Sequence, residues 1–222
     1  MIKKTINYIY TGPVYRFFDE EIYANSFCEG NIRISTLESC RAYENPEQGD
    51  KNEATWHHKI DSMLLNDPDE EQIRALQWAG FSVGQGSKNI YFENITTTTV
   101  LPDAYVLCMT KHLDPKAFSG SFGKYCVEIS NAHYFFNLIH RKIVENHTKS
   151  RVDGLYGDIN YSDRKSLNLQ TPHTHIGFIK PVFPYASQRE FRFLWVVEEQ
   201  TCELKKLDIK CPEAAFLCKR II

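Results

Sequence analysis

The segment at residues 188–197, QREFRFLWVV, constrains the fold of this chain more than any other stretch. Every second residue from Phe191 to Val197 is large and apolar, which predicts a β-strand with one face in the hydrophobic core. The opposite face begins with Glu190 and Arg192 and then becomes apolar. Such a strand either borders a cleft at its charged end or is a half-buried edge strand whose Glu and Arg are solvated.

The composition indicates an ordinary globular protein. The chain has 222 residues, of which 42% are hydrophobic and 24% are charged, which is enough for one α+β domain over residues 1–222. The net charge of −2 excludes a generally basic surface but leaves room for a local basic groove. The apolar runs are shorter than the roughly 20 residues that cross a bilayer, so no membrane contact is expected.

The seven cysteines are an odd number, are widely scattered and form no C-x-x-C pair. This usage is typical of thiols that serve as small apolar residues in a reducing compartment. The N-terminus has two lysines but no apolar segment of the kind found in a signal peptide. We therefore expect a cytoplasmic protein.

The N-terminal third predicts a compact strand–helix–strand unit. Residues 6–10 are rich in β-formers and precede the breaker Thr11-Gly12-Pro13, so they predict a first strand. Acidic residues at 19–21 open a helix that Gly30 ends, and residues 31–36 predict a second strand. Four residues then lie at strand ends, where a ligand could bind: Tyr10, Thr11, Ser35 and Thr36.

The rest of the chain continues this mixed pattern. Residues 37–56 are polar and predict a surface loop, and a helix is expected over 64–80 with Asp67 as its N-cap. Another helix is expected over 131–145, and further strands at 90–95, 104–110, 125–129, 152–159 and 176–182. Strand-rich segments broken by two or three helices favour an α+β fold, with a split or strongly bent mixed sheet.

Established catalytic motifs are absent. The sequence contains no H-E-x-x-H, no G-x-S-x-G, no Walker loop and no G-x-G-x-x-G after a strand. Asp50, Glu53 and His57 lie within one short stretch and could bind a metal ion, so a metal-dependent nuclease is one alternative.

Several short blocks together resemble an uncharacterised bacterial domain family that is associated with defence systems and mobile elements. The blocks are the N-terminal unit, residues 48–53, 106–110 and 122–129, and Arg189-Glu190-Phe191-Arg192, in this order. Their layout is also similar to that of compact ADP-ribosyltransferases, including the toxin–antitoxin and phage-defence branch. The tryptophan that this family has between the 106–110 and 122–129 blocks is missing, and Phe118 or Phe122 would replace it.

The resemblance implies an ADP-ribosyltransferase-like fold and NAD as the cofactor. Glu190 matches the catalytic glutamate, Tyr10 with Thr11 matches the first-strand position, and Ser35 with Thr36 matches the second. Arg41 is the candidate for the pyrophosphate. Breaking the nicotinamide–ribose bond develops an oxocarbenium-like ribose, which one carboxylate can stabilise. The chain departs from many such enzymes in having Tyr instead of His on the first strand, and no E-x-E.

The leading hypothesis is therefore a cytoplasmic effector, bacterial or phage-encoded, that transfers ADP-ribose from NAD to an unidentified nucleic-acid or protein acceptor. An antitoxin or another defence-system component would be its partner. The second hypothesis is a non-catalytic module that uses the same cleft for a protein or nucleotide ligand. The third is the metal-dependent nuclease.

Overall fold

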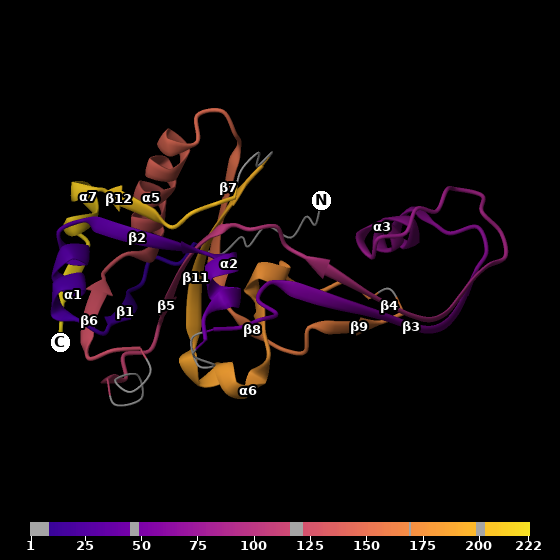
Figure 1. The fold of residues 1–222 in the computed structure, drawn as a ribbon, viewed down its shortest axis with the longest axis horizontal. Coiled ribbons are helices and arrows are strands. Elements are labelled where there is room, and N and C mark those ends of the chain that lie inside the picture. The colour runs from indigo at the N-terminus through magenta and orange to yellow at the C-terminus, as the bar shows by residue number, and fades with distance from the viewer. Residues whose placement is uncertain (1–8, 45–48, 116–121, 169, 199–202) are drawn as a thin grey trace.

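The chain folds into a broad body and a projecting arm, as Figure 1 shows for the computed structural model. The structure describes residues 9–44, 49–115, 122–168, 170–198 and 203–222. Strands and helices of both parts are intermixed along the chain, so the predicted α+β class is confirmed. No helix in the described part of the chain is long and apolar enough to cross a membrane.

The body is built on strand β5 (Tyr105–Thr110), whose almost continuously apolar sequence is buried on both faces. One edge of β5 pairs along its whole length with antiparallel β11 (Glu190–Val197), and β11 pairs in turn with β7 (Val152–Asp158). Because β11 has a neighbour on each side and its charged end is buried, the edge-strand alternative for this segment is wrong.

The opposite edge of β5 is shared by two strands that diverge. Strand β2 (Asn31–Thr36) pairs with Tyr105 and Val106, whereas β1 (Val14–Phe18) pairs with Thr110. The sheet is therefore split between β1 and β2, and the middle of β5 lies at the split. Strand β12 (Leu207–Lys210) extends the sheet beyond β2. On the other side, β6 (Tyr125–Ile129) and then β13 (Cys218–Arg220) extend it beyond β1.

Each face of β11 packs against a different core, as its alternation predicts. Phe193 and Trp195 lie under helix α5 (Ala132–Asn146), where the ring of Phe136 stacks on Trp195 with centroids 5.3 Å apart. Leu194 lies on the other face, in a smaller cluster with Val106 of β5. The predicted partition of this strand is confirmed.

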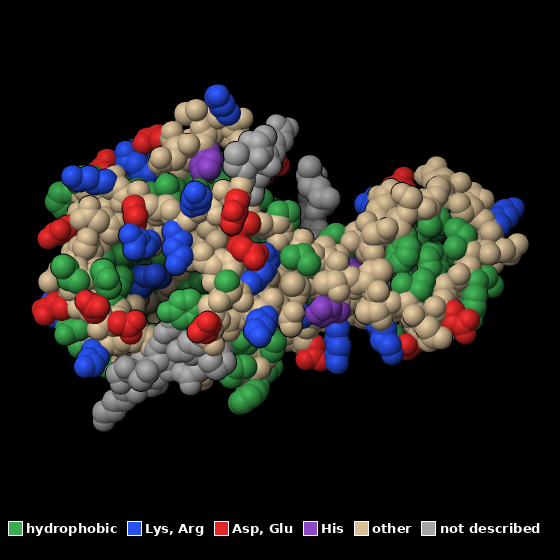
Figure 2. All heavy atoms as spheres, viewed as in Figure 1, with side chains coloured by type: hydrophobic (Ala, Val, Ile, Leu, Met, Phe, Trp, Pro, Cys, Tyr) green, Lys and Arg blue, Asp and Glu red, His purple; other side chains and the backbone are tan. Residues whose placement is uncertain are grey.

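The arm consists of a long hairpin and one helix. Strands β3 (Thr55–Leu65) and β4 (Ile90–Val100) pair over most of their length. Helix α3 (Glu70–Trp78) packs on them around a small separate core that includes Leu76 and Phe92. The short strand β9 (Lys165–Leu167) pairs with the base of β3. Figure 2 shows apolar side chains on the arm face that is turned to the viewer.

Short elements connect these parts. Helix α1 (Glu21–Cys28) joins β1 to β2, and Gly30 follows it in a left-handed conformation, as predicted. The others are α2 (Leu37–Ala42), β8 (Asn160–Tyr161), β10 (Ile179–Lys180), α6 (Val182–Tyr185), α7 (Pro212–Ala215) and two 3₁₀ turns (Ile176–Phe178 and Ala186–Gln188).

Five sequence predictions need correction. The main sheet is not mixed, because all its described strand pairs are antiparallel. The first strand does not end at Tyr10, because the Gly12-Pro13 breaker precedes β1 instead of following it; residues 6–8 lie outside the described part. Residues 37–56 are not a plain loop, since α2 forms there. The helix predicted over 64–80 begins only at Glu70, because β3 continues to Leu65 and Asp69, not Asp67, provides the cap. The strand predicted over 176–182 is only two residues long, and helical turns flank it.

Two glycines that follow helices provide a matched test of the packing. Gly30 and Gly80 have φ of 85° and 91°, but a Cβ at Gly30 would lie 2.3 Å from the carbonyl oxygen of Cys211, whereas a Cβ at Gly80 meets nothing within 4 Å. We expect Gly80→Ala to lower the free energy of unfolding by about 1–2 kcal/mol through backbone strain alone. Gly30→Ala should cost roughly 1–3 kcal/mol more. Urea titration of both variants measures the difference, and equal losses would contradict the close contact.

Candidate functional site

A pocket of about 790 Å³ opens where the sheet splits. Its walls come from β1, α1, β2, α2, β5, β10, the start of β11, and β12. In Figure 2, Lys and Arg side chains gather around a hollow in this part of the body. The residues that matter for the chemistry below are Arg16, Ser35, Cys108, Lys180 and Glu190. The volume lies within the range of sites that bind small molecules and cofactors.

One wall of the pocket belongs to a closed ring of buried charges. The Glu190 carboxylate accepts a hydrogen bond from Arg192 Nε at 2.7 Å and forms an ion pair with Lys180 Nζ at 2.7 Å. Arg192 Nη1 also donates to Glu53 Oε1 at 2.8 Å, and Lys180 Nζ lies 3.5 Å from Glu53 Oε2. All four side chains are at most 5% exposed. Two carboxylates and two cations thus alternate around the ring.

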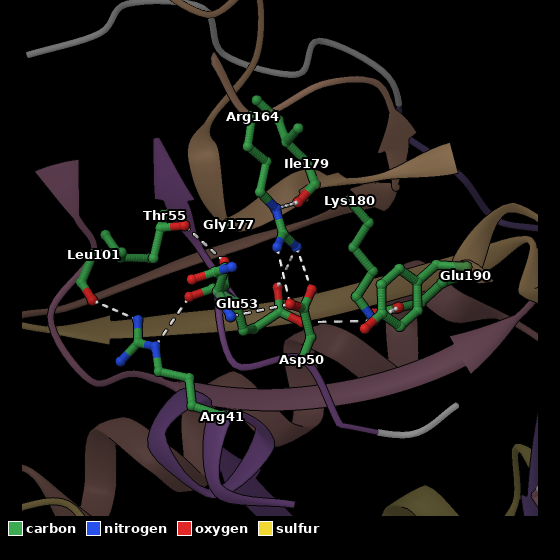
Figure 3. Close-up of polar contacts among 12 residues, drawn as sticks. Arg41, Asp50, Glu53, Thr55, Leu101, Arg164, Gly177, Ile179, Lys180 and Glu190 are labelled. Atoms are coloured by element: carbon green, nitrogen blue, oxygen red, sulfur yellow. Dashed lines mark hydrogen bonds and ion pairs between the residues drawn. The ribbon is translucent and has the colours of Figure 1, made fainter. Parts of the chain in front are cut away.

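A further ion pair extends this ring towards the arm. The guanidinium of Arg164 donates two hydrogen bonds to Asp50, one of them 3.0 Å long at Nη1, and lies 3.8 Å from Glu53. Its Nε donates to the carbonyl oxygen of Ile179 at 3.0 Å. Figure 3 shows Asp50 and Glu53 between Arg164 and Lys180. Three acids and three bases therefore neutralise one another inside the protein, as burial of charge requires.

Local structure aims these side chains at one another. Asp50 and Glu53 lie in a tight turn that leads into β3, in which Glu53 N donates to Asp50 O at 2.8 Å. Lys180 is on β10, next to α6. Glu190 and Arg192 are two residues apart on β11 and share the face that is turned away from the aromatic core. The period of two along the strand makes them neighbours.

The ring fixes the protonation states of its members. Burial by itself would raise the pKa of Glu190, but Arg192 and Lys180 outweigh it and lower that pKa to about 2. The pKa of Glu53 is lowered too, since Arg192 and Lys180 outweigh its burial. For Lys180, burial lowers the pKa, but Glu190 and Glu53 outweigh it and the net shift is upward. Glu190 is therefore an anion of very low basicity, and Lys180 stays protonated, so neither is suited to accept a proton at neutral pH.

Arg16 of β1 is a functional candidate that the sequence prediction missed. Its Nη1 donates to the carbonyl oxygen of Cys108 at 2.7 Å, and its guanidinium lies 5.5 Å from the ring centroid of Phe18. Its Nε is completely buried and has no hydrogen-bond partner among the described residues. Burial lowers the pKa of Arg16, and only the thiols of Cys108 and Cys40 act in the other direction.

Two of the predicted site residues, Glu190 and Ser35, line the pocket. Thr36, the neighbour of Ser35, instead caps helix α2 by accepting a hydrogen bond from Ser39 N at 3.1 Å. Arg41 lies outside the pocket lining, and its donors bind Glu53 O, Glu38 and Leu101 O at 2.9–3.1 Å. Figure 3 shows Arg41 reaching from α2 towards Leu101. It joins α2 to the two ends of the arm hairpin, so it is not available for a pyrophosphate at the pocket.

Tyr10 and Thr11 also lie outside the pocket lining. The ring of Tyr10 packs 5.2 Å from that of Phe191, whose side chain points to the face of β11 opposite Glu190. Lys111 Nζ lies 4.0 Å above the Tyr10 ring. The reason is the breaker at Gly12-Pro13, which places both residues before β1, where they cannot reach the split.

The stretch that predicted a metal site has a different role. Asp50 and Glu53 bind cationic side chains, and His57 Nδ1 lies 2.9 Å from Thr98 Oγ1 on the arm. Within the described ranges, no three His, Cys, Asp or Glu side chains lie together so as to hold a metal ion.

Comparisons with known proteins give no relatives: no family model, no curated protein and no solved structure matches this chain. Any functional conclusion therefore rests on the pocket and on the charges around it.

Removing one cation from the ring should destabilise the protein strongly. Arg192→Met leaves the buried Glu190 with only Lys180, and Glu53 with Lys180 and the more distant Arg164, and we expect a loss of about 3–5 kcal/mol in the free energy of unfolding. Arg74→Met is the matched control, since Arg74 pairs with Glu70 on the arm surface, where both side chains are more than 60% exposed. That change should cost less than about 1 kcal/mol. Chemical denaturation of both variants measures the contrast, and equal small losses would show that the ring contributes nothing.

The depressed pKa of Glu190 predicts a particular acid sensitivity. Its folded pKa of about 2 lies below the ordinary value of 4.5, so between these pH values the unfolded chain binds more protons than the folded one. The stabilisation is complete above about pH 4.5 and is lost as the pH falls towards 2. In Glu190→Gln, the slope of stability against pH in this window should decrease by at most about 1.4 kcal/mol per pH unit. Glu93→Gln, which changes an exposed arm residue, should keep the wild-type slope.

Proposed function

We propose that this protein transfers ADP-ribose from NAD to a macromolecular acceptor. The observation that carries the proposal is that Glu190 and Ser35 line one pocket of about 790 Å³ at the split of the sheet. A cleft of this size can hold a dinucleotide. The thiols of Cys28, Cys40, Cys108, Cys126, Cys211 and Cys218 are all free, which suits an effector that acts in the cytoplasm.

The reaction breaks the bond between the ribose C1 and the nicotinamide nitrogen, and nicotinamide leaves with the bonding electrons. The ribose then carries positive charge at C1, which a fixed anion at Glu190 would stabilise. The acceptor forms a new bond to C1 and gives up its proton. A carboxylate with a pKa of about 2 is a weak base at neutral pH, so in this proposal Glu190 acts through its charge and the proton goes to water.

A second candidate function is a binding module without turnover. Both Glu190 oxygens already have partners, Oε1 with Arg192 and Oε2 with Lys180. A carboxylate engaged in this way can hold the pocket in shape without contacting a ribose. In that case the pocket would take a nucleotide or protein ligand, and an antitoxin or defence-system partner would recognise the complex. No comparable observation favours the nuclease alternative.

Turnover of NAD distinguishes the two candidates. Incubation of the protein with labelled NAD and cell lysate should give label transfer and nicotinamide release. Glu190→Gln should lower the rate by roughly 10²–10³-fold, because it removes the stabilising charge. Ser35→Ala should lower it less, by about tenfold, because it removes a single hydroxyl from the pocket. Glu93→Gln on the arm serves as the control and should keep the wild-type rate.

Because Glu190 belongs to the buried ring, its variant must be shown to fold, by melting temperature and circular dichroism. Ser35 lies outside the ring and keeps the proposal testable if Glu190→Gln unfolds. Wild-type turnover that persists in a folded Glu190→Gln would contradict the role of the glutamate. Nucleotide binding with no nicotinamide release in the wild type would favour the binding module.

A further inference from the structure

Arg16 differs from Lys180 and Arg33, two other cations of the pocket lining, in its lack of a counter-charge among the described residues. Lys180 has Glu190 and Glu53, and Arg33 has Asp208 at 2.7 Å. Arg16 forms no ion pair with any described carboxylate, although its Nε is as inaccessible to water as an atom of the core. Among the described residues, its side chain forms one hydrogen bond, to a neutral acceptor, the carbonyl oxygen of Cys108.

This arrangement is unfavourable in the free protein. A guanidinium that has lost water must recover the lost interactions from hydrogen bonds and opposite charge. The Cys108 carbonyl and the Phe18 ring provide part of this, but neither of them neutralises the charge. An unsatisfied buried polar group is rare in a native protein and calls for an explanation, and a bound ion is one such explanation.

The rest of the pocket has the same sign of charge. Five basic and three acidic residues line it, whereas the whole chain carries a net charge of −2. Two of the acids are already neutralised by ion pairs, Glu190 with Lys180 and Asp208 with Arg33. An entering anion therefore meets an excess of positive charge that is concentrated in a concave, partly dry space, where it acts most strongly.

We propose that Arg16 binds a phosphate group of the pocket's ligand through the N–H donors of its two terminal nitrogens that the Cys108 carbonyl does not use. Two parallel N–H groups match two phosphate oxygens, and a phosphoryl or pyrophosphoryl group carries enough negative charge to offset the excess around it. The identification of the ligand as a nucleotide rests on the proposed function. The anion site itself does not, because it follows from the contacts of Arg16 alone.

The test compares Arg16→Met with the wild type in calorimetric titrations with inorganic pyrophosphate and with ADP-ribose. The wild type should bind both, and Arg16→Met should weaken both by about tenfold or more. Arg16→Lys keeps the charge but loses the paired donors, and should fall between the two. Arg74→Met removes an arginine charge on the arm, away from the pocket, and should bind like the wild type.

Thermal melting provides an independent readout. Because the Arg16 charge is partly desolvated and has no counter-charge among the described residues, Arg16→Met should melt at the same temperature as the wild type or higher, while binding is lost. A purely structural arginine would give the opposite result, with a lower melting temperature and unchanged affinity for the anion. That outcome would overturn the proposal.

The remaining outcomes are equally decisive. Failure of the wild type to bind either probe at millimolar concentration would overturn the anion site, whatever the NAD assay shows. Binding of pyrophosphate but not of ADP-ribose would contradict the identification of the ligand as a nucleotide and would indicate a small free anion instead. Binding of both pyrophosphate and ADP-ribose that is weakened in Arg16→Met, with no NAD turnover in the wild type, would uphold this inference and refute the proposed transferase.

Discussion

The ring formed by Glu190, Arg192, Glu53 and Lys180 is the constraint on which the rest of the structure depends. Each of these charges loses several kcal/mol of hydration on burial, and only close alternation of sign compensates for that loss. The ring closes only if β10, β11 and the turn before β3 meet with contacts of 2.7–3.5 Å. It therefore fixes how the arm joins the body, because Glu53 leads directly into β3. An apolar contact would tolerate a shift that this ring cannot.

The same ring sets what the pocket can do. Lys180 and Glu190 belong to both, so the wall of the pocket that carries the candidate carboxylate is also part of the buried ring. Pairing keeps Glu190 ionised and in place, which favours stabilisation of a developing positive charge. It also occupies both oxygens, which favours simple binding. The two functional candidates differ in whether Glu190 acts on the ligand through its charge or only holds the pocket in shape.

Local signals in the sequence predicted local features well. The period of two in 190–197 assigned the correct residues to each face of β11, and Gly30 marked the end of α1. The charge partners could not be predicted in this way, since Asp50 and Arg164 are 114 residues apart and Glu53 and Arg192 are 139 apart. Asp50 and Glu53 lie in a polar stretch that is typical of a solvated loop, yet both are buried. Their burial follows from pairing with cations that are distant in the sequence, and a local sequence pattern cannot indicate such partners.

Arg16 shows where a sequence signal was present and was overlooked. It is the one charged residue of the strand Val14–Phe18, VYRFF. By the period of two, it lies on the same strand face as Val14 and Phe18, which pack against the main core. A charge at such a position requires either a buried counter-charge or an opening in the sheet. The divergence of β1 and β2 provides the opening, and the described carboxylates provide no counter-charge. The neutral ring and the unpaired arginine thus divide the pocket into a wall without net charge and a positive surface. This asymmetry would orient an elongated anionic ligand with its phosphate at β1 and its other end at Glu190.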